Sequence, residues 1–67
     1  MRDPDRIERV IEKLRRLWYS HPDQRLGQLL CNVAPRTRDL FQVEDDVTED
    51  RLDVAIQGGF DALTRLA

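Results

Sequence analysis

Residues 7–18 read IERVIEKLRRLW, and this stretch decides the fold class. Its apolar side chains recur at steps of three and four residues: Ile7, Val10, Ile11, Leu14, Leu17 and Trp18. This spacing predicts an α-helix with one apolar stripe, which we expect to face the core. Asp3 suits the N-cap of this helix and Pro4 its first position. Because the residue before a proline is pushed out of the helical region, Pro22 should end the helix near residues 19–20.

A second helix is predicted after a short turn. Ser20 can cap it, with Asp23 three positions later as in a capping box, and Pro35 ends it. Its apolar stripe consists of Leu26, Leu29, Leu30 and Val33. Gly27 lies beside this stripe, where we expect it to let the first helix approach closely under Trp18. Two helices joined by so short a turn form a helical hairpin, either antiparallel or crossing at a steep angle.

The segment from residue 35 to residue 47 is the least regular part of the chain. Turn-forming residues open it, and a short apolar run follows for which the sequence offers no partner strand. We expect a loop whose Phe41 and Val43 dock onto the helices and close the core. A third helix is predicted to begin at Thr48, a suitable N-cap residue with acidic residues after it.

Two consecutive glycines, Gly58 and Gly59, fall within the third helix, whose apolar phase continues beyond them. Together they cost roughly 2 kcal/mol in a continuous helix. We therefore expect either a break with a short last helix over residues 60–66 or a frayed end. Residues 1–67 are thus predicted to form one small all-α domain of three helices. It consists of a helical hairpin, a docking loop and a third helix with a Gly-Gly break.

Length and composition exclude several classes of protein. A chain of 67 residues is too short for a two-domain enzyme, a doubly wound sheet or a barrel. It contains no run of 18 apolar residues, so we expect no membrane span. The N-terminal residues lack the apolar segment of a signal peptide, which points to the cytoplasm. A single cysteine forms no internal disulfide, and a domain this small often gains stability from an oligomer contact or a partner.

Charge is distributed unevenly along the chain. Residues 1–38 carry nine basic and five acidic side chains, whereas residues 39–67 carry two basic and eight acidic ones. We favour the interpretation that the two halves pack side by side and stabilise each other electrostatically. The alternative is a nucleic-acid-associated regulator whose basic half contacts phosphates without reading bases. The basic residues of this alternative are Arg9, Lys13, Arg16, Arg36 and Arg38.

No constellation of residues indicates catalysis or metal binding. Cys31 and His21 are ten residues apart, too far along helices for a thiol and its base, and Cys31 is expected to be a small buried hydrophobe. One cysteine and one histidine cannot supply the four ligands of a structural zinc site. An acidic cluster lacks the pattern of an EF-hand, and we interpret it as a solvated helix start; its members are Glu44, Asp45, Asp46, Glu49 and Asp50. We therefore expect no enzyme, no cofactor and no small-molecule substrate.

Several residues together resemble a known family. They are Arg2, Asp3, Pro4, Arg6 and Ile7, then Trp18, then Pro22, Asp23, Arg25, Leu26, Gly27, Gln28 and Leu29, and finally Asn32, Phe41, Glu44 and Asp45. Over residues 2–46 the chain thereby resembles the YihD-type family of small bacterial and phage proteins. The resemblance implies a small helical cytoplasmic protein without a known activity, so it supplies no functional residues.

The sequence as a whole favours a non-enzymatic interaction or regulatory protein, an accessory of phage or mobile-element origin that binds a protein partner or a second copy of itself. Trp18 is in phase with the apolar stripe and is assigned to the core, whereas Tyr19 lies off the stripe and is free for an interface, where aromatic residues are enriched. The predicted contact face consists of Tyr19, Arg25, Gln28 and Asn32. For Arg25 we favour a structural role instead, in which it pairs with the acidic segment 44–46.

Overall fold

The helix predicted from the opening stretch is α1, which spans Asp5–Ser20 in the computed structural model. The structure describes residues 3–65. An Asp3 carboxylate oxygen accepts a hydrogen bond from the Asp5 N–H at 2.9 Å and so caps the helix. The helix ends shortly before Pro22, where the sequence places its end. The predicted C-terminal end is confirmed, whereas the helix begins at Asp5, one residue later than predicted, with Pro4 at the N-cap.

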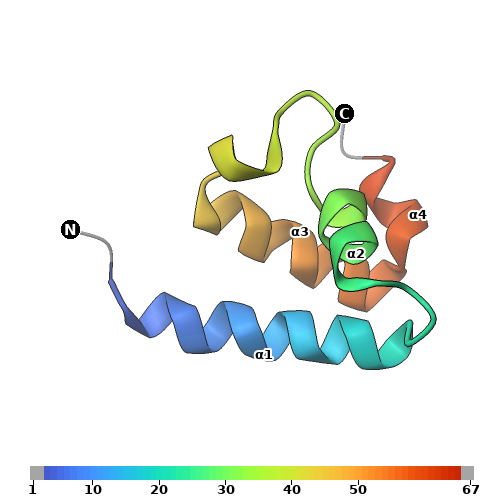
Figure 1. Cartoon of the computed structure of the whole chain (residues 1–67), viewed down its shortest axis with the longest axis horizontal. Coiled ribbons are helices and arrows are strands. Elements are labelled where there is room, and N and C mark those ends of the chain that lie inside the picture. The colour runs from blue at the N-terminus through green and yellow to red at the C-terminus, as the bar shows by residue number, and fades with distance from the viewer. Residues whose placement is uncertain (1–2, 66–67) are drawn as a thin grey trace.

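Four further elements follow α1 along the chain (Figure 1). They are α2 (Leu26–Val33), a short 3-10 helix η1 (Leu40–Gln42), α3 (Asp45–Gly58) and α4 (Phe60–Leu63). Helix α1 packs mainly along α3, while α2 contacts α3 and α4 and crosses the direction of α1 steeply. Residues 3–65 contain no β-strand, so the all-α prediction is confirmed.

The core lies where the four α-helices meet. Its buried side chains are Leu17, Leu29, Val33, Leu52, Ala55 and Leu63. From helix α1, the side chain of Leu17 is fully buried in this cluster. Val10 and Leu14 pack against the cluster but stay partly accessible to solvent. Only one edge of the α1 stripe therefore faces the core.

Helix α2 begins at Leu26, later than a helix capped by Ser20 would begin. Ser20 does not serve as its cap, since the Ser20 Oγ donates a hydrogen bond back to the Arg16 carbonyl at 3.1 Å. Instead, the side-chain oxygen of Gln28 accepts a hydrogen bond from the Arg25 backbone N–H at 3.0 Å. A glutamine in the first turn thus satisfies a backbone donor at the helix start, as the acidic residue of a capping box would.

Gly27 does not mediate a close helix approach. It is exposed, and a Cβ placed on it would meet no atom within 4 Å. The predicted contact under Trp18 is therefore wrong. The indole packs at the turn between α1 and α2, where its Nε1 donates a hydrogen bond to the Gln24 carbonyl at 2.8 Å.

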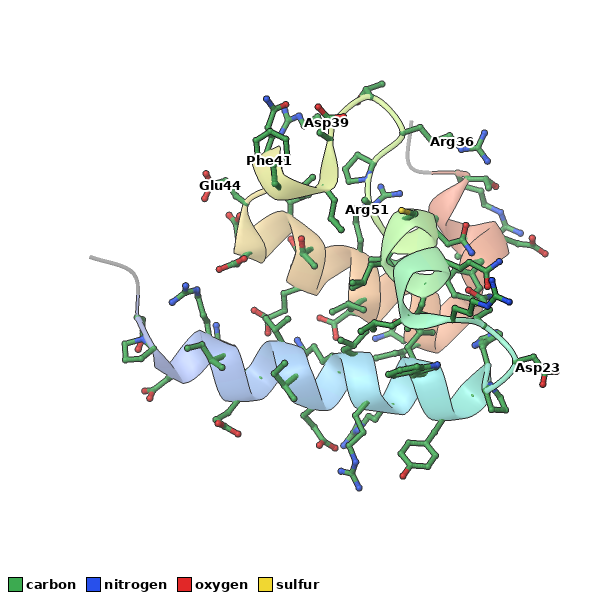
Figure 2. All side chains as sticks on the ribbon, in the orientation of Figure 1. Asp23, Arg36, Asp39, Phe41, Glu44 and Arg51 are labelled. Carbon is green, nitrogen blue, oxygen red and sulfur yellow. The ribbon has the colours of Figure 1, made fainter. Side chains whose placement is uncertain are left out.

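The loop between α2 and α3 docks onto the helices through Val43. This side chain is buried, whereas Phe41 is largely exposed and lies at the outer edge of the molecule (Figure 2). The prediction is confirmed for Val43 and wrong for Phe41, because residues two positions apart around a 3-10 turn point in different directions. Helix α3 begins at Asp45 rather than Thr48, since the Glu44 carbonyl already accepts a hydrogen bond from the Thr48 N–H at 3.1 Å.

The double glycine breaks the helix, as predicted. Helix α3 ends at Gly58, and Gly59 has a φ of 77°, in the left-handed region that favours glycine. The Gly59 N–H donates a hydrogen bond to the Ala55 carbonyl at 2.8 Å and so closes the end of α3. A Cβ on Gly58 would lie 2.8 Å from the Ala62 Cβ, so a side chain there would displace α4 from α3.

The α-helices differ widely in length, from four residues in α4 to 16 residues in α1. The prediction places the last helix over residues 60–66; α4 ends at Leu63, and residue 66 lies outside the described residues. Between residues 3 and 65, no helix is both long enough and apolar enough to cross a membrane.

Candidate protein-interaction surface

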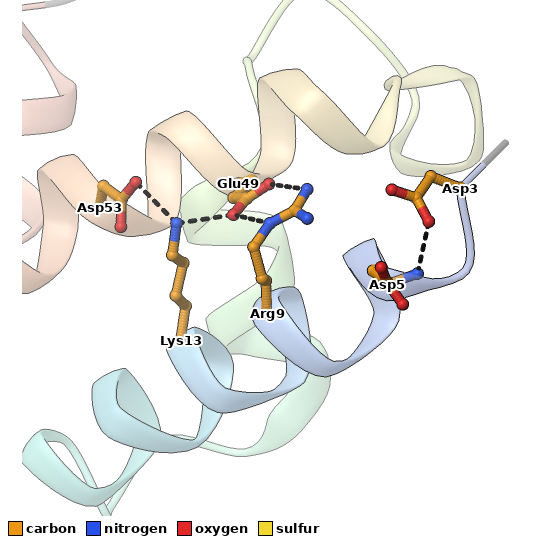
Figure 3. Close-up of polar contacts among 6 residues, drawn as sticks. All are labelled: Asp3, Asp5, Arg9, Lys13, Glu49 and Asp53. Atoms are coloured by element: carbon orange, nitrogen blue, oxygen red, sulfur yellow. Dashed lines mark hydrogen bonds and ion pairs between the residues drawn. The ribbon is translucent and has the colours of Figure 1, made fainter.

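A row of ion pairs joins α1 to α3 (Figure 3). The Arg9 Nε donates a hydrogen bond to a Glu49 carboxylate oxygen at 3.0 Å. The Lys13 Nζ lies 2.7 Å from the same Glu49 oxygen and 2.9 Å from an Asp53 oxygen. These contacts place the basic half of the chain against the acidic half. The favoured interpretation of the uneven charge is therefore confirmed.

Glu49 is the centre of this row. Hydrogen bonds from Arg9 and from Lys13 lower the pKa of the Glu49 carboxyl from 4.5 to about 2. Hydrogen bonds to Glu49 and to Asp53 in turn raise the pKa of the Lys13 ammonium. Arg9 and Lys13 are thus already paired with carboxylates, and a phosphate would have to displace those partners.

The other basic residues of the nucleic-acid hypothesis lie apart from this row. Arg16 pairs with Glu12 on α1 at 3.3 Å. Arg36 and Arg38 belong to the loop after α2, and Arg36 lies across the molecule from α1 (Figure 2). There the two arginines line an open depression together with Arg51. The structure does not gather the five predicted residues on one surface.

The acidic cluster at the start of α3 is tied to α1 by Arg6, whose Nε lies 2.5 Å from an Asp45 oxygen. In the described part of the chain, Arg25 forms no ion pair with Asp45 or Asp46. Arg6 thus takes the role that the sequence assigned to Arg25, because α2 begins near the opposite end of α1 from the start of α3 (Figure 1). Within residues 3–65, no three His, Cys, Asp or Glu side chains form a group that could hold a metal ion.

A ridge of large apolar side chains on α1 faces outward. Ile7 is 51% exposed, Ile11 54% and Trp18 36%, and the partly buried Leu14 forms the inner edge of the ridge. We call these four residues the α1 ridge. The prediction that they face the core is wrong for the three exposed ones. The apolar stripe of α1 is wider than the surface that the rest of the chain covers, and Leu17, Val10 and Leu14 pack against that surface.

A shallow, open depression adjoins the ridge. It is lined by Ile11, Leu14, Arg15, Trp18, Tyr19 and Pro22. The Arg15 guanidinium carbon lies 5.8 Å from the centroid of the Tyr19 ring, within the range of a cation–π contact. The indole N–H of Trp18 is already satisfied by a backbone carbonyl, so a partner meets its apolar ring without leaving a buried donor unpaired. Tryptophan, tyrosine and arginine are also the residue types that dominate binding hot spots.

The four residues of the predicted contact face are all exposed, but they do not form one surface. Tyr19 belongs to the depression beside the ridge. Gln28 caps α2, and Asn32 donates a hydrogen bond to the Gln24 side chain at 3.0 Å. Asn32 lines the other depression, the one that contains Arg36. Tyr19 therefore joins the α1 ridge, while the polar residues of α2 lie apart from it.

Cys31 is exposed rather than buried, because Leu29 and Val33 form the core face of α2 and residue 31 falls between them on another face. His21 packs edge-on against the Phe60 ring, with 4.8 Å between the ring centroids. The imidazole thus covers the end of the core.

Comparisons with known protein families, with curated proteins and with solved structures find no match for this chain. The resemblance of residues 2–46 to the YihD-type family therefore stays a prediction, and its first residue, Arg2, lies outside the described residues. The surface formed by the α1 ridge and Tyr19 is therefore the candidate site for binding a partner.

Proposed function

We propose that this protein is a small non-enzymatic interaction or regulatory protein of the cytoplasm that binds a protein partner through the α1 ridge and Tyr19. The ridge itself carries the proposal, since three large apolar side chains lie exposed in one line along a single helix. Contiguous exposed apolar surface on a small domain marks an interaction site or an aggregation liability. The resemblance to small phage and bacterial proteins agrees with an accessory role.

The ridge offers a partner enough apolar surface to bind. Ile7 and Ile11 are each about half exposed, and covering them contributes about 1 kcal/mol per side chain. Trp18 and Tyr19 add aromatic rings, which provide a large contact area at a low cost in conformational entropy. Phosphates offer nothing that could cover these side chains, so this surface suits a protein rather than a nucleic-acid backbone.

A capture experiment with matched variants tests this function. The tagged full chain is incubated with host lysate, with and without nuclease, and compared with Ile11→Glu and Gln57→Glu. Ile11→Glu places a charge in the middle of the ridge, while Gln57→Glu adds the same charge at an exposed position of α3. Both variants should keep the helical circular dichroism spectrum, because both positions are exposed.

We expect a defined protein to co-purify with the wild type and with Gln57→Glu in both nuclease arms, and to be lost with Ile11→Glu. Capture that survives Ile11→Glu unchanged would place the binding surface elsewhere. In that case, the same capture experiment with Arg25→Ala tests whether the partner binds the polar face of α2. Recovery of nucleic acid, with proteins lost after nuclease, would favour the alternative of a nucleic-acid-associated regulator acting through Arg36 and Arg38.

A further inference from the structure

We propose that the partner of the α1 ridge is the α1 ridge of a second copy, and that the two helices run antiparallel about a two-fold axis. This dimer rests on the proposed function, because it uses the same surface. Closed two-fold dimers are the commonest oligomers, and in them one surface patch meets itself. The ridge must therefore be complementary to itself in spacing and in charge.

The spacing of the ridge meets the first condition. From Ile7 to Ile11, to Leu14 and to Trp18, the steps are four, three and four residues. This is the alternation of a two-stranded coiled-coil seam, and it reads the same from either end. An antiparallel copy therefore presents its side chains at matching heights, with Ile7 opposite Trp18 of the other copy and Ile11 opposite Leu14.

The charges beside the ridge meet the second condition. Glu8 follows Ile7 and Arg15 follows Leu14, so both charged residues lie along the same outer edge of the ridge. In the antiparallel arrangement, Glu8 of one copy lies within two residues of the height of Arg15 of the other, about 3 Å along the axis. In a parallel arrangement about a two-fold axis along the helices, the edges that carry Glu8 and Arg15 would lie on opposite sides of the seam, so these charges could not meet.

Both charged side chains are available for this contact. Glu8 is exposed, and among residues 3–65 it forms no ion pair. The Arg15 side chain is 62% exposed and touches Glu12 through Nη1 at 3.1 Å. Because a guanidinium carries five N–H donors, Arg15 can keep Glu12 and accept a second carboxylate.

The other edge of the ridge faces the body of its own chain, so the contact is one helix wide. Helix α1 has 16 residues and is about 24 Å long at 1.5 Å per residue. This makes the interface smaller than that of a typical stable complex. We therefore expect a dissociation constant on the order of 10 to 100 µM.

Sedimentation equilibrium of the full chain, from about 5 to 500 µM, tests the dimer. The wild type and Gln57→Glu should pass from monomer to dimer over this range, whereas Ile11→Glu should remain monomeric. Glu8→Arg and Arg15→Glu should each raise the dissociation constant roughly three- to tenfold, because each places like charges together at two symmetric positions. The double variant Glu8→Arg/Arg15→Glu should restore the wild-type value, which only the antiparallel arrangement predicts.

A wild type that stays monomeric at all concentrations would overturn the dimer. So would an Ile11→Glu variant that still dimerises, or a double variant that is no tighter than the single ones. A monomeric chain would leave the proposed function intact if the lysate capture still depends on Ile11. Capture independent of Ile11 would remove the proposed function, so the two failures are distinguishable.

Discussion

Leu17 and Ile11 belong to one apolar stripe in the sequence, but the structure predicts that their replacement by alanine has very different costs. Leu17 is 1% exposed and touches the buried cluster, whereas Ile11 is 54% exposed. Truncation of a fully buried leucine to alanine removes about 3–5 kcal/mol from the free energy of unfolding. Ile11→Ala removes about 1 kcal/mol at most, since half of its side chain is already in water and alanine is the better helix former.

These costs are large for a chain of this size. At roughly 0.05–0.15 kcal/mol per residue, 67 residues give about 3–10 kcal/mol in total. Leu17→Ala should therefore unfold the protein partly or wholly at 25 °C, while Ile11→Ala should keep most of its stability. Urea titration followed by circular dichroism and by Trp18 fluorescence measures both values. It is done at low protein concentration, so that any dimer contributes nothing.

Equal midpoint shifts for the two variants would refute this reasoning. They would mean that α1 is rotated about its axis relative to the core, with Ile11 buried as deeply as Leu17. The α1 ridge would then be part of the core, and both proposals that depend on it would fail with it.

Two glycines and one carboxylate give further tests. Gly59→Ala should lower the free energy of unfolding by about 1–2 kcal/mol, because an alanine at a φ of 77° is strained, whereas Gly27→Ala should raise it by up to about 1 kcal/mol, because the position is helical and open. Thermal melts should move in opposite directions, and a stabilising Gly59→Ala would contradict the positive φ. Glu49 has its pKa lowered from 4.5 to about 2 in the folded state, so its ion pairs stabilise the protein above pH 4.5 and this contribution is lost as the pH falls towards 2. Urea midpoints measured from pH 7 to pH 2.5 should fall less steeply in Glu49→Gln than in the wild type; parallel curves would show that the pairs with Arg9 and Lys13 do not form in solution.

The features that the sequence predicts correctly depend on local chemistry or on total charge. Asp3 and Pro22 fix the ends of α1 through capping and a steric restriction, which act within a few residues. Gly59 marks the helix break because glycine is the residue that adopts its backbone angles easily. The pairing of the two halves follows from opposite charges of similar size, whichever residues make the contacts.

The sequence mispredicts features for which several nearby residues fit the same role equally well, such as the cap of a helix or the buried residue of a loop. The sequence predicts that Ser20 caps α2, whereas in the structure Gln28 accepts the hydrogen bond at the start of the helix. Phe41 and Val43 are both apolar, but the 3-10 turn at residues 40–42 directs only the Val43 side chain towards the core. Neither choice can be made without the neighbouring helices in place.

The candidate site was missed for a related reason. Apolar residues in helical phase are ordinarily assigned to the core, and Trp18 was assigned to it on that ground. Tyr19 was correctly predicted to be exposed, because it lies off the stripe. The width of the stripe gives no warning either. From Leu17 round to Ile11 it covers about a third of the helix circumference, which is typical of a helix that faces a core.

The ion pairs and the ridge lie on opposite sides of the buried strip of α1, and this explains why the ridge stays outside. Rolling α1 about its axis to bury Ile7 and Ile11 would carry Arg9 and Lys13 away from α3. Their bonds to Glu49 would break, and Leu17 would leave the core. Exposed ion pairs add little to stability individually, but in this rotation of α1 they act together with the burial of Leu17. The α1–α3 row therefore fixes which apolar residues are left for a partner.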